Sequence, residues 1–278
     1  MIAVCIATYN QEAYIAQAVE SVLTQECDEP LRIYIGDDAS TDDTSTICER
    51  LAATDNRIRY YRRTQNMGLV NNTLELYRQI MADGCEYIAM LDGDDYWTDP
   101  NKLQLQMDYL RSHPEVGFIH TGAYEENNGE KSLMDDADIP VGDISKRYNL
   151  SGARQTNCTV VFRTDLLRKV NLETIQAQAF PVLDYPLYGL FSQYTEFAFL
   201  AVPTAVWRNH SSVSQPSNWS NYIHYRHERL RMWKWLDGLH PNSFHFDRIK
   251  AQKWLIRQNF SFFIKKISLL FAYIRKNQ

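Results

Sequence analysis

"YIAMLDGDDYW", residues 87–97, joins an apolar run to a cluster of carboxylates, and this stretch decides how the chain is interpreted. The apolar part is typical of a buried strand, and Asp92, Asp94 and Asp95 follow it directly. Carboxylates a few ångströms apart repel one another and raise one another's pKa unless a cation lies between them. The stretch therefore predicts a divalent metal ion bound at the end of a strand.

Strand and helix alternate through the first part of the chain. Short apolar runs are separated by segments in which apolar residues recur at helical spacing. This alternation predicts an α/β fold with a parallel sheet whose two faces are covered by helices. The predicted strands are residues 2–7, 31–36, 57–62 and 87–91, and the predicted helices carry Ile15 to Val22, Ile47 with Leu51, and residues 66–81 with Leu74, Tyr77 and Met81 on one face.

Polar clusters follow each of these predicted strands. They are "TYN" at 8–10, "DDAS" at 37–40, "TQN" at 64–66 and "DGDD" at 92–95. In open parallel sheets the ligand binds beyond the carboxyl ends of the strands. We therefore expect the four loops to form one site at one edge of the sheet.

The second half of the chain is less regular. "KLQLQMDYLRSHP" predicts a helix that stops before Pro114, and the polar stretch 125–143 predicts a surface loop. Strands are expected at 116–120 and 157–163, and a helix within 179–191. Residues 196–208 suggest strands broken at Pro203, and from about Tyr222 the pattern is helical to the end.

Charge and cysteine usage exclude several classes of protein. The net charge is −5, yet from Arg248 onward there are eight Lys or Arg and no Asp or Glu, which leaves about −13 on the remainder. An acidic body with a basic tail argues against a nucleic-acid binder.

The five cysteines lack C-x-x-C spacing, so neither a disulfide framework nor a zinc site is indicated and a reducing compartment fits. The N-terminus is typical of a first strand, not a signal peptide, and no uncharged apolar run is long enough to span a membrane.

The D-x-D at 92–94 has two interpretations. At a strand end it can hold Mg²⁺ or Mn²⁺ by one or two carboxylates and leave coordination positions for substrate phosphates. The alternative is an Asx turn with helix-capping aspartates, because "DDYWTDP" contains turn-forming residues. The second pair, Asp37 and Asp38, favours a ligand site, since a carboxylate there can accept a hydrogen bond from a nucleobase imide or a ribose hydroxyl.

Four stretches together resemble a known family. "ATYNQEAYIAQAVESVLTQ", "IGDDASTDDT", "NMGL" and "LDGDDYWTDPNKLQLQMDYL" are similar, in order and spacing, to the nucleotide-sugar-binding half of family 2 glycosyltransferases. These are GT-A enzymes of bacterial surface-polysaccharide synthesis. The resemblance is strong over 1–125 and weaker to about 215. It implies a GT-A catalytic domain at 1–215, with a nucleotide-sugar half at 1–125 and an acceptor half at 126–215, followed by a helical extension at 216–278.

The resemblance also implies roles for the donor-side residues. Tyr9 is expected near the nucleobase, Asp38 accepts from a uracil-type imide, and Asp92 with Asp94 engages ribose and metal. The alternatives are a core position for Tyr9 and a helix cap for Asp38. The implied donor-binding set is Ala7, Tyr9, Asp37, Asp38, Asn66, Gly68, Asp92, Gly93 and Asp94, and the implied metal ligands are Asp94, Asp95 and His210.

One departure from the family concerns the helix after "N-x-G". The family usually has a basic residue there, whereas this chain has Asn71 and Asn72. Arg62 or Arg63 is the candidate substitute, and both are equally compatible with a solvated surface.

The acceptor side supplies the implied base. A sugar hydroxyl has a pKa far above neutrality, so a carboxylate must take its proton as it attacks the anomeric carbon. By resemblance, "VLDYPLYGL" places this base at Asp184, and the alternative is an N-cap to the helix that follows. His210, supported by Arg208, is implied near the metal or diphosphate. Thr156 or Asn157 is expected along the acceptor side from position alone.

The C-terminal segment forms an apolar stripe beside basic residues. It carries Ile256, Phe260, Phe263, Ile267, Leu270 and Ile274 at helical spacing. Such a helix can pack on its own protein, lie on an anionic membrane surface or pair with a second copy.

The sequence thus predicts a metal-dependent inverting hexosyltransferase that uses Mn²⁺ or Mg²⁺. Its donor is a nucleotide diphosphate sugar, with UDP implied by resemblance, and its acceptor a hydroxyl of a glycan or lipid-linked glycan. The expected location is the cytoplasm, including the inner face of the plasma membrane. The alternatives are a sugar nucleotidyltransferase and a non-catalytic nucleotide-binding protein of the same fold. "TYNQEAYI" lacks the glycines of the nucleotidyltransferase phosphate loop.

Overall fold

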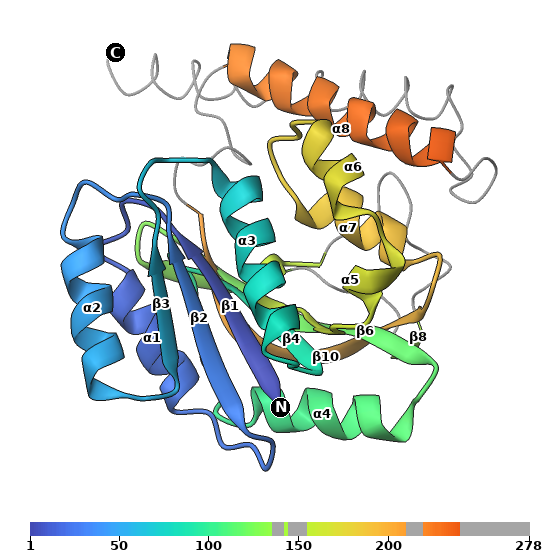
Figure 1. The fold of residues 1–278 in the computed structure, drawn as a ribbon. Helices are drawn as coiled ribbons and strands as arrows, with labels where there is room; N and C mark the ends of the chain where they lie inside the picture. Colours follow the sequence, from blue (N-terminus) through green and yellow to red (C-terminus); the bar gives the residue numbers. More distant parts are fainter. Residues whose placement is uncertain (135–141, 144–154, 210–218, 240–278) are drawn as a thin grey trace, which may run out of the picture. The chain divides into compact units, whose positions relative to one another are not determined.

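The computed structural model describes residues 1–134, 142–143, 155–209 and 219–239 (Figure 1). The chain forms two compact units, Met1–Tyr148 with Gly152–His210, and Asn149–Ser151 with Ser211–Gln278. His210, the boundary expected at 215 and the apolar stripe beyond Leu239 lie outside the described residues. The domain division and the roles given to these segments therefore stay predictions.

One sheet runs through the first unit, and within the described ranges its strands are β1 Ile2–Thr8, β2 Leu31–Asp37, β3 Ile58–Arg62, β4 Tyr87–Asp92, β5 Tyr96–Trp97, β6 Val116–Asn127, β7 Glu130–Leu133, β8 Gly142–Asp143, β9 Val161–Arg163 and β10 Glu196–Arg208. Their order is β3-β2-β1-β4-β9-β6-β10-β5, with β7 paired to β6 and β8 to β10. β3, β2, β1 and β4 are parallel, as are β6 and β10, while β9 is antiparallel to both of its neighbours. This mostly parallel sheet confirms the predicted α/β class.

The helices of the first unit are α1 Ile15–Leu23, α2 Thr44–Thr54, α3 Leu69–Ala82, α4 Lys102–Ser112, α5 Leu166–Lys169, α6 Leu172–Ala177 and α7 Asp184–Phe191, with a 3₁₀ turn, η2, at Asn157–Thr159. The second unit contains α8 Trp219–Leu239. Among the described residues, no helix combines the length and the apolar character needed to cross a membrane.

The alternation of side chains along β1 divides the core into two layers. Ile2, Val4 and Ile6 are fully buried in a cluster with apolar residues of α1, α2 and α4. On the opposite face, α3 contacts β1 and β2, and its Tyr77 packs edge-on against Phe162 of β9. Figure 1 shows α1 and α2 on one side of the parallel strands and α3 on the other. The sheet is therefore held between two helical layers, which leaves its carboxyl edge to the loops.

The prediction of a surface loop at 125–143 is wrong for its first residues. β6 continues to Asn127 and forms a hairpin with β7, turning through Asn128 and Gly129 at φ of 51° and 83°. Asn-Gly with two positive φ angles is the signature of a two-residue hairpin turn. The sequence carried this signal, but the polar composition of the stretch obscured it.

Two further strand predictions need correction. Residues 157–159 form η2 rather than the start of a strand, and only Val161–Arg163 pair as β9. β10 is continuous through Pro203, where shifts of register on either side accommodate the proline. A bulge of this kind places proline where no ladder hydrogen bond is required.

Candidate active site

The loops after β1, β2, β3 and β4 meet at one edge of the sheet. In the strand registers, Thr8 pairs with Asp37, Asp37 with Arg62, and Ala7 with Asp92. Ala7 is buried, and its carbonyl accepts a hydrogen bond from Gly93 N at 3.3 Å. The polar clusters that were noted in the sequence are thus neighbours in space.

The loops after β1 and β2 are joined by reciprocal hydrogen bonds. Asn10 N donates to Ser40 Oγ at 3.0 Å, and Thr41 N donates to Asn10 Oδ1 at 2.8 Å. Asn10 and Ala39 both hold positive φ angles, 52° and 62°, and such a conformation persists only where the surroundings fix it. The two loops therefore form one preorganised wall of the site.

Tyr9 lies on this wall and is 45% exposed. It is therefore not a core aromatic, which was the alternative interpretation of its position. An exposed ring beside the site is compatible with stacking on a base.

Asp37 and Asp38 play different structural parts although they are adjacent. Asp37 is fully buried and accepts hydrogen bonds from Ser40 N and the Tyr60 hydroxyl, each at 2.8 Å. Asp38 accepts from Met67 N and Gly68 N, also at 2.8 Å. Asp38 therefore fixes the loop before α3 and does not cap α2.

The "N-x-G" loop ends at Gly68, whose φ of 85° suits glycine alone. Asn66 is exposed at the edge and its Oδ1 accepts from Gly68 N at 3.1 Å. With Asp38, this interaction shapes the loop that follows β3.

The two asparagines that replace the family's basic residue are engaged within the protein. Asn72 donates to Gly36 O at 2.7 Å and accepts from Arg63 Nε at 2.9 Å. Asn71 donates to Met67 O and accepts from Gln176 Nε2. Arg63 thus lies beside the site, oriented by Asn72.

Gly93 is required by a close approach. A Cβ at this position would come within 2.3 Å of Gln11 Oε1 and 3.0 Å of the Thr8 side chain. Thr8 Oγ1 donates to Gln11 Oε1 at 2.7 Å, so these two side chains hold each other in place against the glycine. Residues 92–95, the acidic loop after β4, therefore pack closely against the end of β1.

Two carboxylates, Asp94 in the same loop and Asp184 from a distant part of the chain, influence Asp92. Burial, followed by the charge of Asp94 and, more weakly, that of Asp184, raises the pKa of Asp92 to about 7, against the lowering effect of its hydrogen bond with Asn157. All three are half-buried, and Asp184 is the first residue of α7 rather than a cap before it. Negative charge thus accumulates between the loop after β4 and the start of α7.

Asp95 follows Asp94 in the same loop and is only 1% exposed. Its Oδ1 accepts from Arg208 N at 2.8 Å, and its carboxyl group lies next to the buried Cys158 thiol. Burial and the neighbouring carboxylates hold the pKa of Asp95 well above its usual range. This placement gives Asp94 better access to a ligand than Asp95.

Arg208 closes the site from the end of β10. Its guanidinium lies over the rings of Tyr14 and Tyr96, at 4.9 and 4.5 Å from their centroids. It also donates to the Asp94 carbonyl oxygen and pairs with Glu126. The sequence predicted only a support for His210 here, and no spacing pattern indicated these contacts.

Sequence reasoning also missed the environment of Asn157. Its side chain is half-buried, donates to both oxygens of Asp92 and accepts from the Tyr188 hydroxyl. Thr156, the other residue expected on the acceptor side, donates to Met134 Sδ at 3.5 Å. Asn157 therefore lies in the candidate site, in direct contact with Asp92.

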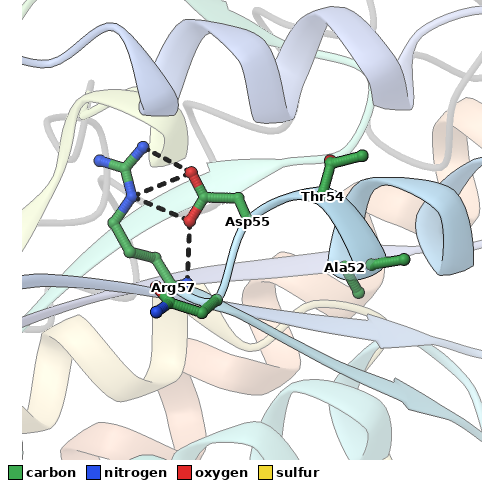
Figure 2. A pocket seen from close by; sticks show the side chains of 6 residues that line it. Ala52, Thr54, Asp55 and Arg57 are labelled. Atoms are coloured by element: carbon green, nitrogen blue, oxygen red, sulfur yellow. Dashed lines mark hydrogen bonds and ion pairs between the residues drawn. The ribbon is translucent and has the colours of Figure 1, made fainter.

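A hollow of about 510 Å³ at residues 52–57 lies away from this site (Figure 2). It precedes the first residue of β3, at the amino edge of the sheet, and Figure 2 shows Asp55 facing Arg57. Their ion pair of 2.7 Å uses both charges locally. Nothing about this hollow points to a ligand.

Comparison with known proteins defines the class. The sequence model of Glycosyl transferase family 2 matches residues 3–170, which is more than half of the chain. This chain belongs to glycosyl transferase family 2, and the resemblance drawn from its motifs is confirmed.

Several characterised and uncharacterised proteins are similar in sequence. An uncharacterized Mycobacterium tuberculosis protein is 35% identical over 213 residues, 73% of this chain and 57% of that protein. The dTDP-rhamnosyl transferase RfbG of Shigella flexneri is 26% identical, covering 83% of this chain and 80% of its own. The UDP-Glc:alpha-D-GlcNAc-diphosphoundecaprenol beta-1,3-glucosyltransferase WfaP of Escherichia coli is 29% identical, over 69% and 68%. The chain thus spans just over half the length of the first curated relatives it matches.

Two solved structures share the fold. S. aureus TarS 1–349 in complex with UDP-GlcNAc superposes with a TM-score of 0.63 at 15% identity, covering 93% of this chain and 71% of its own. The mannosyltransferase PcManGT from Pyrobaculum calidifontis, in complex with GDP-Man and Mn²⁺, has a TM-score of 0.62 at 16% identity, over 91% and 69%. These likenesses confirm the GT-A fold.

Asp92 and Asp94 suit a metal ion that is bound jointly by the protein and a substrate. Within the described ranges, no three His, Cys, Asp or Glu side chains are grouped to hold an ion by themselves. Asp94 offers hard carboxylate oxygens at the accessible edge, next to Asp92. Mg²⁺ is commonly bound through one or two carboxylates together with substrate phosphates. The residues present therefore fit an ion shared with a diphosphate.

Proposed function

We propose that this chain is a metal-dependent inverting glycosyltransferase that moves a sugar from a nucleoside diphosphate donor to a hydroxyl group. The observation that carries the proposal is that Asp92 is connected, through Asn157 and Tyr188, to the helix that begins with Asp184. Asp92 ends β4 and Asp94 lies in the loop after it, on the donor side, while Asp184 begins α7 on the acceptor side. Carboxylates on two sides of one centre are what an in-line displacement needs.

In this mechanism the donor half binds and orients the nucleotide. The wall formed by the loops after β1 and β2 receives the base beside Tyr9. Asp38 is 3% exposed, and among the described residues each of its oxygens accepts one backbone N–H, which leaves lone pairs for a base imide. Asp92 hydrogen-bonds the ribose, and Asp94 would hold Mn²⁺ or Mg²⁺. The ion, when bound, neutralises charge on the departing diphosphate.

The acceptor half supplies the base. Asp184 takes the proton of the acceptor hydroxyl as its oxygen forms the new bond to the anomeric carbon. The bond from that carbon to the diphosphate oxygen breaks, and its electron pair leaves with the nucleoside diphosphate. Because attack and departure lie on opposite sides of the carbon, the configuration inverts. Base catalysis of this kind contributes roughly 10²–10⁴ to the rate.

The relatives support the substrate classes. Their names include UDP-glucose and dTDP-rhamnosyl donors, and one acceptor is a lipid-linked diphosphate sugar. We take a UDP-sugar as donor and a glycan or lipid-linked glycan of cell-surface polysaccharide synthesis as acceptor. The protein then works in the cytoplasm, at the inner face of the membrane, where the basic residues after Arg248 favour an anionic surface.

A donor screen tests the proposal. Wild type is incubated with UDP-, dTDP- and GDP-sugars, with and without Mn²⁺, and release of the nucleoside diphosphate is measured. We expect slow, metal-dependent hydrolysis of one donor class and a loss of about 10²–10⁴ in Asp184→Asn. Asp165→Asn, which removes an exposed carboxylate paired with Lys169, is the matched control. Equal turnover in wild type and Asp184→Asn would contradict the assigned base.

A further inference from the structure

Asn157 lies between the donor and acceptor halves of the site. Its Nδ2 is 3.0 and 3.1 Å from the two oxygens of Asp92, and its Oδ1 accepts from the Tyr188 hydroxyl at 2.7 Å. Tyr188 is one helical turn after Asp184 on α7. A continuous set of hydrogen bonds therefore connects the base-bearing helix with the first carboxylate of the acidic loop.

The chemistry of the three groups fixes the orientation of the amide. The Asn157 NH₂ group faces both oxygens of Asp92, and an ionised carboxylate can only accept hydrogen bonds, which favours this orientation of the amide. The amide oxygen then points to Tyr188, whose hydroxyl can donate. A reversed amide would place its oxygen against the carboxylate, so Tyr188 and Asp92 together select one orientation.

The turn that carries Asn157 is itself held by buried donors. Trp97 Nε1 donates to Cys158 O at 2.8 Å, and Gln106 Nε2 donates to Thr159 O at 2.9 Å. Lys102 Nζ, fully buried, lies 3.3 Å from the same Thr159 oxygen. These donors follow the acidic loop in sequence, so the loop and the turn are built as one unit.

Tyr188 is equally constrained. It is 1% exposed, and its ring packs against Phe118 at 4.7 Å between centroids. A side chain locked by packing holds its hydroxyl in a fixed place. Both ends of the Asn157 amide are therefore set by rigid neighbours.

We propose that Asn157 is a positioning residue that holds the Asp92 carboxylate in the orientation needed to bind the nucleotide of the donor. The proposal rests on the proposed function, because it assigns Asn157 a part in donor binding through Asp92. Hydrogen-bond partners of metal-ligating side chains commonly contribute 10- to 100-fold to metal affinity or activity, and we expect an effect of similar size for a carboxylate that binds the nucleotide. Nothing in the family's motifs identified this residue.

The test uses the full chain and three variants. Asn157→Ala removes both contacts, Tyr188→Phe removes only the hydroxyl that orients the amide, and Asn171→Ala removes a side-chain cap on α6 as the control. Titration calorimetry measures the Kd for UDP, dTDP and GDP with MnCl₂, and kinetics give the KM for donor and for acceptor. Thermal unfolding of each variant is recorded in parallel.

We expect Asn157→Ala to weaken nucleotide binding by about 10- to 100-fold and to raise the donor KM with little change in the acceptor KM. Tyr188→Phe weakens binding less, and the double variant loses less than the product of the two single effects. Asn171→Ala changes only the unfolding temperature. A merely structural role would lower the unfolding temperature of Asn157→Ala and leave Kd unchanged.

The outcomes separate the two proposals. If wild type binds a nucleotide and Asn157→Ala binds it equally well, the positioning role is overturned and the proposed function stands. If wild type binds none of the three nucleotides, the proposed function fails and the positioning role fails with it.

Discussion

Arg208 N donates a hydrogen bond of 2.8 Å to Asp95 Oδ1, which ties the end of β10 to the acidic loop after β4. The two residues are 113 positions apart, so the contact connects two distant parts of the chain. The contact also shows that Asp94 and Asp95 have different surroundings. Asp94 is accessible at the sheet edge, whereas Asp95 is buried in the framework below it.

Substitution of Asp95 distinguishes a framework carboxyl from a ligand. Because its pKa is held well above the usual range, Asp95→Asn resembles the protonated form and should keep most of the stability. Asp95→Ala leaves the Arg208 amide unsatisfied and should lower the free energy of unfolding by about 1–3 kcal/mol. Urea unfolding measures both. Equal stability of wild type and Asp95→Ala would contradict the framework role.

Gly93→Ala tests the close contact between the acidic loop and β1. The added methyl would meet the Gln11 and Thr8 side chains, which hold each other by a hydrogen bond. We expect a loss of about 1–3 kcal/mol in the free energy of unfolding. Gly238→Ala in α8, where a Cβ would meet nothing within 4 Å, is the control and should be neutral or slightly stabilising. A Gly93→Ala protein as stable as wild type would show that the loop moves freely.

Lys102 predicts a dependence of stability on pH. Burial lowers the pKa of Lys102 to about 7, whereas in the unfolded chain it is close to 10.5. Between these values the unfolded state binds more protons, so this group makes the protein more stable as pH rises from 7 to 10. Lys102→Met lacks the effect. Its stability advantage over wild type should be largest near pH 7 and shrink by a few kcal/mol toward pH 10.

The comparison with Lys102→Met cancels other titrating groups, since both proteins share them. Urea unfolding at half-unit steps of pH gives the difference directly. A difference that stays constant from pH 7 to pH 10 would mean that Lys102 is protonated in the folded protein throughout.

Local pattern was sufficient to predict most of the strands and helices up to β4. The strands ending at Thr8, Asp37, Arg62 and Asp92 follow from short apolar runs between helical periods, and the place of the site follows from their parallel order. The hairpin at 124–133 was missed because polar side chains on an exposed edge give no apolar alternation. Only its Asn-Gly turn indicated it.

The part of the chain after β5 was less predictable because its contacts are long-range. Asn157 reaches Asp92 across 65 positions, and Arg208 reaches Asp94 across 114. No periodicity in the sequence encodes such pairs, which depend on β9 entering the sheet antiparallel between β4 and β6. The burial of Asp95 next to the accessible Asp94 likewise follows from the way β10 closes over the loop.

The central claim is that Asp94 binds a divalent ion together with the diphosphate of the donor. The most direct measurement is calorimetric titration of UDP, dTDP and GDP, with and without Mn²⁺, into wild type and Asp94→Ala. We predict that wild type binds one nucleotide only with the metal and that Asp94→Ala, still folded, loses this binding. Unchanged, metal-dependent affinity in Asp94→Ala would contradict the account.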